Sequence, residues 1–378
     1  MIPFNKPHLT GRELDYIANA HARGQLAGDG YFTKKCSIWL EDHIGCLKAL
    51  LTHSCTAALE MAAILADIQP GDEVIMPSYT FVSTANAFVL RGGIPVFIDI
   101  REDTLNINER LIEKAINSKT KAIVPVHYAG VACEMDVIME IARQYKLLVI
   151  EDAAQAIMST YKGRQLGSIG DLGCYSFHET KNLISGEGGA LLVNNPDLLE
   201  RAEIIREKGT NRSQFFRGQV DKYTWVDMGS SYLPGELIAA FLYAQLQDAS
   251  SITSRRLALW SHYHEILDPV CNEFKCCKPP KVSGLPHNAH MYYLIFDHAY
   301  GRDLFIDQMR DRGVHCVFHY VPLHSSHFGR QNSKAIGNLE VTQKTSEAIV
   351  RLPLFIDMDQ DVVISMAKEC IEIVARSL

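Results

Sequence analysis

Lys181 and Asp152 are residues of the types that exchange an amino group with a carbonyl compound. Lys181 lies between a β-rich segment and a glycine-rich loop, and Asp152 ends an apolar segment earlier in the chain. A lysine amine forms a Schiff base with an aldehyde, and a carboxylate keeps a ring nitrogen protonated. Alone, Asp152 also fits a helix N-cap, and Lys181 also fits an exposed surface lysine. As a pair they predict a site for pyridoxal 5'-phosphate (PLP).

A second group of residues could hold a phosphate. Ser54, Cys55 and Thr56 follow an apolar segment and precede an alanine-rich run, so free N–H groups and the positive end of a helix dipole would meet an anion there. Hydroxyls of Ser54, Thr56 and Ser176 would add hydrogen bonds. Alone, these residues would simply cap a helix. Phe81 could stack on a ring, although a single aromatic residue also fits the core.

These residues need a sheet that brings the ends of several strands together. From residue 47 to 152, β-rich runs alternate with amphipathic helical windows, which is typical of parallel βαβ units. The pattern predicts a doubly wound α/β sheet with Asp152 at the carboxyl end of a strand, where ligands bind. The expected strands are residues 48–52, 73–76, 95–100, 122–126 and 147–151, and the expected helices are 56–67, 83–91, 109–116 and 135–145.

The rest of the chain completes this large domain and adds a smaller one. The large domain gains strands at 174–177 and 190–193 and helices at 196–208 and 235–246. We place the large domain at residues 1–250 and a smaller α+β domain at 251–378. The second part is expected to contain a connecting helix at 251–268, a boundary loop at 278–286, extended segments at 291–296 and 314–320, a helix at 302–312, and a closing helix from Gln360.

Composition argues against several other classes of protein. The chain has 378 residues, of which 47% are hydrophobic and 21% charged, and its net charge of −7 does not suit a nucleic-acid binder. The longest apolar run, residues 237–244, is far shorter than the ~20 residues of a membrane-spanning helix. Residues 1–7 lack the apolar part of a secretion signal, so we expect a cytoplasmic protein. The ten cysteines form no CxxC pair, which indicates reduced thiols and no metal site.

Motifs along nearly the whole chain resemble those of the PLP-dependent sugar-nucleotide aminotransferases of the DegT/DnrJ/StrS family. The resemblance implies the aspartate-aminotransferase fold (PLP fold type I), with a large, mostly parallel sheet and a smaller C-terminal α+β domain. It also implies homodimers that share their active sites. The motifs are residues 2–4, 6–7, 55–59, 77–81, 125–130, 151–155, 176–178, 180–182, 319–324 and 352–354.

The resemblance also implies a role for each matching residue. Lys181 would form the Schiff base, Asp152 would pair with the pyridinium nitrogen, and Gln155 would bond the oxygen of the ring hydroxyl. Phe81 would stack on the ring. The residues implied to hold the phosphate are Cys55, Thr56 and Ser176, and those implied to contact substrate are Arg212, His319 and Tyr320.

One position departs from the family pattern. The partner chain of a family dimer usually contributes a phosphate-binding Asn from a Gly-x-Asn-Tyr-Arg-Met stretch, but here residues 229–234 place Ser231 at that position. A serine hydroxyl can still donate to a phosphate, with shorter reach. Together with residues 206–225, the departure resembles the branch of the family that acts on dTDP-sugars for enterobacterial cell-surface polysaccharide. Basic residues there, Arg212 among them, suit a diphosphate or an ordinary solvated loop.

The resemblance therefore implies a transaminase that takes an amino group from glutamate and places it on C4 of a dTDP-4-keto-6-deoxy sugar. The configuration of the new amine, galacto or gluco, stays open, as does a 3-keto substrate. A sugar dehydratase of the same fold typically replaces the lysine by histidine, and Lys181 argues against that reading. A PLP-binding regulator without catalysis is the alternative from another class.

Overall fold

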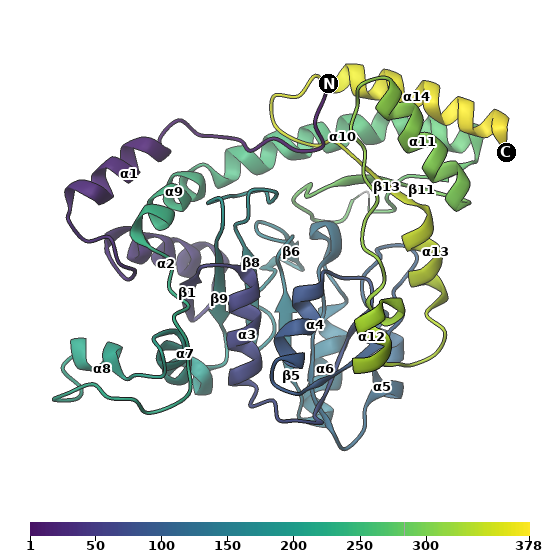
Figure 1. Ribbon diagram of the computed structural model, residues 1–378. Helices are drawn as coiled ribbons and strands as arrows, with labels where there is room; N and C mark the ends of the chain where they lie inside the picture. Colours follow the sequence, from purple (N-terminus) through teal and green to yellow (C-terminus); the bar gives the residue numbers. More distant parts are fainter. Residues whose placement is uncertain (283) are drawn as a thin grey trace.

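A twisted sheet of eight strands forms the centre of the molecule (Figure 1). The computed structural model describes residues 1–282 and 284–378; Ser283 of the expected boundary loop lies outside them. All neighbouring strands are parallel except those paired with β9, which is antiparallel to both its neighbours. The strands, in spatial order, are β1 (Lys48–Thr52), β9 (Gly189–Val193), β8 (Leu172–Ser176), β5 (Leu148–Asp152), β4 (Thr120–Ile123), β2 (Glu73–Pro77), β3 (Ile94–Ile98) and β12 (Lys334–Ala335).

Helices cover both faces of this sheet, which confirms the expected doubly wound architecture. Side chains alternate between the faces, so that Leu50 of β1 belongs to one buried apolar cluster and Leu51 to the other. The face in front in Figure 1 carries α3 (Cys55–Leu65), α4 (Val82–Val89) and α7 (Leu199–Arg206). The opposite face carries α2 (Tyr31–Ile44), α6 (Met135–Tyr145) and α9 (Glu236–Gln247), and α1 (Glu13–Ala22) packs against α9.

The C-terminal part of the chain has an apolar cluster of its own. It contains a three-stranded antiparallel sheet, one face of which packs against long helices while the other face, with Tyr293 and Ile349, packs against residues such as Tyr79 and Tyr128. The elements here are α10 (Ala249–Phe274), β10 (Cys277–Lys278), β11 (Tyr292–Phe296), α11 (Ala299–Asp311), α12 (His327–Asn332), α13 (Glu340–Ala348), β13 (Ile349–Leu352) and α14 (Gln360–Ser377).

The expected domain boundary near residue 250 stays a prediction, and α10 begins there with Ala249 and Ile252 in the apolar core of the large part. β12 also adds an edge strand to the large sheet, and Ile2 pairs with Val314, so the two parts share elements.

Four expected elements differ from the structure. The expected strand at 122–126 is β4 at Thr120–Ile123, beyond which only Val126 makes an isolated bridge, and the expected helix at 196–208 is a 3₁₀ turn at Pro196–Leu198 followed by α7. Residues 314–320 form no strand and make only isolated bridges, at Val314 and Val317, because the segment turns into the interior where Tyr320 takes a left-handed backbone with φ 41°. The expected helix at 109–116 is a 3₁₀ turn followed by the one-turn helix α5 (Ile112–Ala115). The remaining short elements are β6 (Thr160–Tyr161), β7 (Arg164–Gln165) and α8 (Arg212–Phe216).

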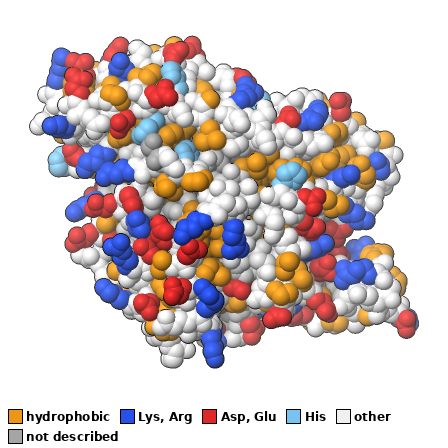
Figure 2. Space-filling model, turned by 180° about the vertical axis from the view of Figure 1, so that it is seen from behind, with side chains coloured by type: hydrophobic (Ala, Val, Ile, Leu, Met, Phe, Trp, Pro, Cys, Tyr) orange, Lys and Arg blue, Asp and Glu red, His pale blue; other side chains and the backbone are white. Residues whose placement is uncertain are grey.

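The described residues contain neither a disulfide nor a cluster of metal-ligating side chains. All ten cysteines are free thiols, and all but the half-buried Cys55 are buried. No group of His, Cys, Asp and Glu side chains in residues 1–282 and 284–378 is placed to hold a metal ion, and no helix there is long and apolar enough to cross a bilayer. Positive and negative side chains are interspersed over the face seen in Figure 2.

A close backbone contact joins β9 to the start of α3. Gly189 pairs with Thr52 on one side and Ser176 on the other, at the edge of the sheet where the predicted site residues gather. A Cβ at Gly189 would lie 2.4 Å from the carbonyl carbon of Ser54 and 2.5 Å from the nitrogen of Cys55. Glycine is therefore required for α3 to begin this close to the sheet.

We expect Gly189→Ala to lower thermal stability and to weaken PLP binding, because the backbone at Ser54 and Cys55 must move to admit the methyl group. Overpacking of this kind costs roughly 1–3 kcal/mol. Gly235→Ala is the matched control, since its Cβ would meet only the carbonyl oxygen of Leu26, at 3.4 Å. Thermal unfolding followed by circular dichroism measures the effect, and equal midpoints for the two variants would contradict the account.

Candidate active site

A cavity of about 900 Å³ lies at the carboxyl ends of the central strands. It opens between the large sheet and segments of the C-terminal part, and it brings together nine of the eleven residues to which the family resemblance assigns a role. Those nine are Cys55, Thr56, Phe81, Asp152, Gln155, Ser176, Lys181, His319 and Tyr320. The other two, Arg212 and Ser231, lie outside this cavity of their own chain.

Lys181 is held in a tight loop that joins β8 to β9. The two strands are antiparallel, and the loop is closed by backbone bonds from Phe177 N to Gly188 O (2.8 Å) and from Glu179 N to Gly186 O (2.8 Å). Lys181 N also donates to His178 O at 2.9 Å. Burial lowers the pKa of the Lys181 amine, and the nearby Asp152 carboxylate opposes this shift. The amine is therefore easier to deprotonate than that of an exposed lysine, which is what a nucleophile or base requires.

Asp152, the last residue of β5, is buried with its carboxylate fixed from two directions. Thr84 Oγ1 donates to one oxygen at 2.7 Å, and Ala154 N donates to the other at 3.2 Å. Thr80 Oγ1 lies 2.8 Å from Thr84 Oγ1. Because an ionised carboxylate only accepts hydrogen bonds, Thr84 must donate to Asp152 and accept from Thr80. This chain of hydroxyls holds the carboxylate in one orientation at the cavity wall.

Gln155 presents its amide N–H groups to the cavity. Its Oε1 accepts from Ala129 N at 2.7 Å, which fixes the amide orientation and leaves Nε2 to donate to Tyr320 OH at 2.9 Å. Nε2 carries a second hydrogen that is free to meet a ligand oxygen. Ala129 and Tyr320 both have positive φ, at 55° and 41°, a conformation that costs about 1–2 kcal/mol per non-glycine residue. Such strain is typical of residues held in place at functional sites.

Residues 288–290 of the C-terminal part form a clamp. They hydrogen-bond to the loop that carries Lys181 and to the loop that carries Gln155. Asn288 Nδ2 donates to Gln155 O and to Ile157 O, each at 2.8 Å. Asn182, the residue after Lys181, donates to Asn288 O at 2.7 Å, and its Oδ1 lies 3.0 Å from His290 Nδ1. The positions of the lysine loop and the Gln155 loop thus both depend on residues 288–290.

The start of α3 forms an anion-binding end of the cavity. The N-cap Ser54 accepts from Ala57 N through its side chain and from Ala58 N through its carbonyl, whereas the N–H groups of Cys55 and Thr56 have no acceptor among the described residues. Thr56 Oγ1 lies 2.7 Å from Ser83 Oγ. Free N–H groups, hydroxyls and the helix dipole converge here, as phosphate binding requires.

Aromatic side chains line the side of the cavity near His319. Tyr128 OH lies 2.7 Å from His319 Nδ1, and the rings of His319 and Tyr320 stack with centroids 3.6 Å apart. Burial, together with the charge of Arg351, holds the pKa of His319 well below its usual range, so the ring is neutral. Phe81 is 57% exposed at the start of α4, with its ring 6.5 Å from that of Tyr320. This exposure leaves its face available for stacking.

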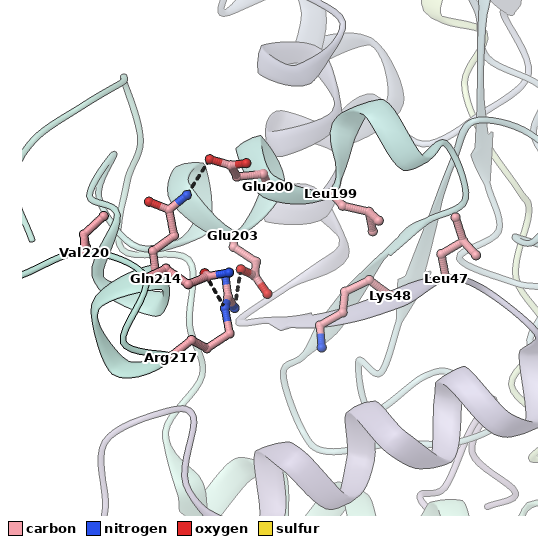
Figure 3. A pocket seen from close by; sticks show the side chains of 9 residues that line it. Leu47, Lys48, Leu199, Glu200, Glu203, Gln214, Arg217 and Val220 are labelled. Carbon is pink, nitrogen blue, oxygen red and sulfur yellow. Dashed lines mark hydrogen bonds and ion pairs between the residues drawn. The ribbon is translucent and has the colours of Figure 1, made fainter.

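A smaller pocket of about 400 Å³ lies between α7, the start of β1 and residues 214–220 (Figure 3). Its polar groups already bond one another: Gln214 donates to Glu200, and Arg217 donates to Glu203 at 2.8 Å. None of the predicted site residues lines it. We therefore place the chemistry in the larger cavity.

Both predicted residues outside the larger cavity lie near one exposed loop. Arg212 begins α8 and lies 3.6 Å from the carboxylate of Glu207, with its guanidinium over the Phe216 ring. Ser231 is exposed and forms a backbone bridge with Glu207. Their predicted roles concern the substrate and a partner chain, so both stay predictions.

Comparison with known proteins assigns the family. Residues 7–370 match the model of the DegT/DnrJ/EryC1/StrS aminotransferase family, and the chain belongs to this family. The protein MJ1066 of Methanocaldococcus jannaschii is 34% identical over 352 residues, which are 91% of this chain and 90% of that protein.

Solved structures share the whole fold. The aminotransferase TlmJ from Streptoalloteichus hindustanus has a TM-score of 0.89 and 28% identity, with 99% of each chain covered. Spr1654 from Streptococcus pneumoniae, a candidate sugar aminotransferase solved in PMP, apo and PLP forms, has in its PMP form a TM-score of 0.90 and 25% identity, with 99% of this chain and 100% of that chain covered. The expected PLP fold type I is confirmed, and the chain is a PLP-dependent aminotransferase.

The side chains of the cavity fit this cofactor. A lysine amine, a fixed carboxylate, an amide N–H and a helix N-terminus with free donors are the groups that an aldehyde, a pyridine nitrogen, a ring oxygen and a phosphate require. The lysine and the carboxylate follow from the sequence motifs. Thr84 and the residue 288–290 clamp do not, because nothing in their local sequence shows that they contact Asp152 and Gln155.

We expect Asp152→Asn to slow the reaction with an amino acid by about 100-fold, because a hydrogen bond to a charged group is worth roughly 1.5–3 kcal/mol. The fold should be unchanged, since the Thr84 hydroxyl can reverse and accept from the new amide. Stopped-flow absorbance of the PLP-loaded protein measures the rate. Asp361→Asn, at an exposed carboxylate on α14, is the control, and equal rates for both variants would move the role away from Asp152.

Proposed function

We propose that the protein transfers the amino group of glutamate to C4 of dTDP-4-keto-6-deoxyglucose, which yields 2-oxoglutarate and dTDP-4-amino-4,6-dideoxygalactose. The observation that carries the transaminase part is the convergence of Lys181, Asp152 and Gln155 with the free N-terminus of α3 in one cavity. The sugar part rests on the family resemblance and on likeness to Spr1654. The product would enter cell-surface polysaccharide of the enterobacterial common antigen type.

Each residue of the cavity has one task in this proposal. The N–H groups of Cys55 and Thr56, with the hydroxyls of Thr56 and Ser176, hold the phosphate. Asp152 would accept a hydrogen bond from the ring nitrogen and keep it protonated, Gln155 would donate to the ring oxygen, and Phe81 would stack on the ring. When bound, PLP supplies an electron sink that stabilises negative charge at the substrate carbon.

Lys181 is the residue that transfers a proton to or from the substrate carbon in both halves of the proposed reaction. Its Nζ takes the hydrogen from the carbon that carries the amino group of glutamate, and in the second half of the reaction it delivers a proton to C4 of the sugar. The burial that lowers the pKa of this amine favours the neutral form needed to accept the proton. The closed loop between β8 and β9 fixes the backbone of Lys181 at the wall of the cavity.

Four alternatives remain distinct from this proposal. A 3-keto substrate or a gluco product would use the same residues, so the product itself must be examined. A dehydratase is disfavoured because Lys181 is retained. A PLP-binding regulator without catalysis would not need an amine whose pKa is lowered, beside a carboxylate held by two donors.

The proposed active unit is a homodimer with shared sites. Six large apolar side chains of residues 212–228 are exposed, and Trp225 is exposed by 79%. A cluster of this kind on a folded chain marks an interaction surface. It lies next to Ser231, and the family resemblance implies that this residue meets the phosphate bound by the partner chain. The six residues are Phe215, Phe216, Tyr223, Trp225, Val226 and Met228.

The substrate assignment is tested by incubating the purified protein with PLP, glutamate and dTDP-4-keto-6-deoxyglucose and determining the product structure by NMR. We expect an axial amine at C4. An equatorial amine at C4 would establish the gluco alternative, and an amine at C3 from a 3-keto substrate would move the position. Consumption of glutamate without an amino sugar, or no reaction at all, would contradict the proposed function.

Shared sites predict complementation between two defective chains. Ser231→Ala should weaken PLP binding about fivefold, since a neutral hydrogen bond contributes about 1 kcal/mol, and Ser231→Trp should block the site. A mixed dimer of Lys181→Ala and Ser231→Trp chains contains one site with both an intact lysine and an intact serine. We expect mixing to restore activity. Failure to restore it, or full activity of Ser231→Trp alone, would place Ser231 away from the partner's site.

A further inference from the structure

Ser78 and His324 join two segments of the cavity wall that lie far apart in the sequence. Ser78 follows β2 and is fully buried, and His324 lies in the 3₁₀ turn Leu323–Ser325. Ser78 O accepts from Leu323 N at 3.0 Å, and Ser78 Oγ accepts from His324 N at 3.0 Å. The same Oγ lies 2.7 Å from His324 Nδ1. Neither Ser78 nor His324 lines the cavity itself.

The hydrogen bond between these two side chains runs from serine to histidine. The Ser78 hydroxyl already accepts from the His324 backbone, and its hydrogen has no other acceptor among residues 1–282 and 284–378. Because buried hydroxyl groups are almost always paired, Ser78 donates to Nδ1 and the ring hydrogen is on Nε2. Burial lowers the pKa of His324, while Asp99 opposes this shift, so the ring is in the neutral form that has a lone pair at Nδ1.

The segment that starts at Ser78 carries Phe81 to the cavity. Phe81 directly precedes α4, and its side chain lines the cavity. Its ring is 57% exposed, so burial of the ring does not fix its position. The position of Phe81 therefore depends on the backbone on either side of it, which is α4 after it and the bonded Ser78 before it.

The segment that ends at His324 carries His319 and Tyr320. The Tyr320 hydroxyl accepts from Gln155 at 2.9 Å, and its ring centroid lies 6.5 Å from that of Phe81. His319 O accepts from Tyr79 OH at 3.0 Å, which is a further bond between the same two segments. The Ser78–His324 pair thus holds together the segments that bring Phe81 and Tyr320 to the cavity.

We propose that the Ser78–His324 pair is a positioning element of the active site, which fixes Phe81 where it would stack on PLP without touching the cofactor or the substrate. A side chain that is already in place loses little freedom when a ring binds against it, so the affinity for the ring is higher. The inference rests on the stacking role given to Phe81 in the proposed function. It does not depend on which sugar is aminated.

Titration of PLP into protein freed of the cofactor tests the inference without turnover. The Kd measures affinity, and the visible circular dichroism of bound PLP reports how firmly its ring is held. We expect Ser78→Ala and His324→Leu each to raise the Kd about fivefold and to weaken the dichroic band, because each breaks the bond between the two side chains. The double variant should bind no more weakly than either single variant, since both changes break the same bond. His262→Leu, at a surface histidine of α10 that bonds Asp361, is the control and should leave the Kd unchanged.

Two further variants separate positioning from a general loss of structure. His324→Asn keeps an acceptor close to the place of Nδ1 and should restore most of the PLP affinity that His324→Leu loses. Phe81→Ala should itself raise the Kd. In that background Ser78→Ala should add less than about twofold, because its effect passes through Phe81.

An unchanged Kd in Ser78→Ala or in Phe81→Ala would overturn the proposal. Equal affinities of His324→Asn and His324→Leu, or an undiminished effect of Ser78→Ala in the Phe81→Ala background, would show a general structural effect and also overturn it. If the unmutated protein binds PLP but forms no amino sugar, the sugar assignment fails, while the Kd values still decide the role of the Ser78–His324 pair.

Discussion

The fixed position of the Asp152 carboxylate at the end of β5 is the constraint on which the rest of the site depends. The preceding residue, Glu151, is fully buried and accepts hydrogen bonds from the backbone of Gly167, Ile169 and Gly170 at 2.6–2.8 Å, and its carboxylate lies 2.9 Å from His127 Nε2. Because His127 Nδ1 accepts from a backbone N–H, Nε2 carries the hydrogen and donates to Glu151. The Glu151 carboxylate, held by these four hydrogen bonds, fixes the end of β5. The ring nitrogen of bound PLP would therefore meet Asp152 at a defined position.

The second requirement is that the large sheet and the C-terminal part both contribute residues to the wall of the cavity. The sheet supplies Lys181, Asp152 and the start of α3, while the C-terminal part supplies the clamp at residues 288–290, the aromatic pair His319 and Tyr320, and Arg351. The left-handed backbone of Tyr320 is the local cost of turning its hydroxyl toward Gln155. The reaction therefore depends on contacts between residues more than a hundred positions apart.

The sequence predicts the elements and residues whose signals are local. The run at 48–52 has the exact bounds of β1, and the motifs around Asp152 and Lys181 place both residues in the cavity. Residues 314–320 have a strand-like composition, but their conformation is set by tertiary contacts that no local pattern records. The roles of Ser231 and Arg212 remain predictions, because they depend on a second chain and on a bound substrate.

The central claim is that Lys181 is the residue that binds PLP covalently. The most direct measurement is borohydride reduction of the PLP-loaded protein, followed by proteolysis and mass spectrometry of the labelled peptide. The account predicts a pyridoxyl group on Lys181 in the unmutated protein and no label at any position in Lys181→Ala. A label on a different lysine, or no reducible link in the unmutated protein, would contradict it.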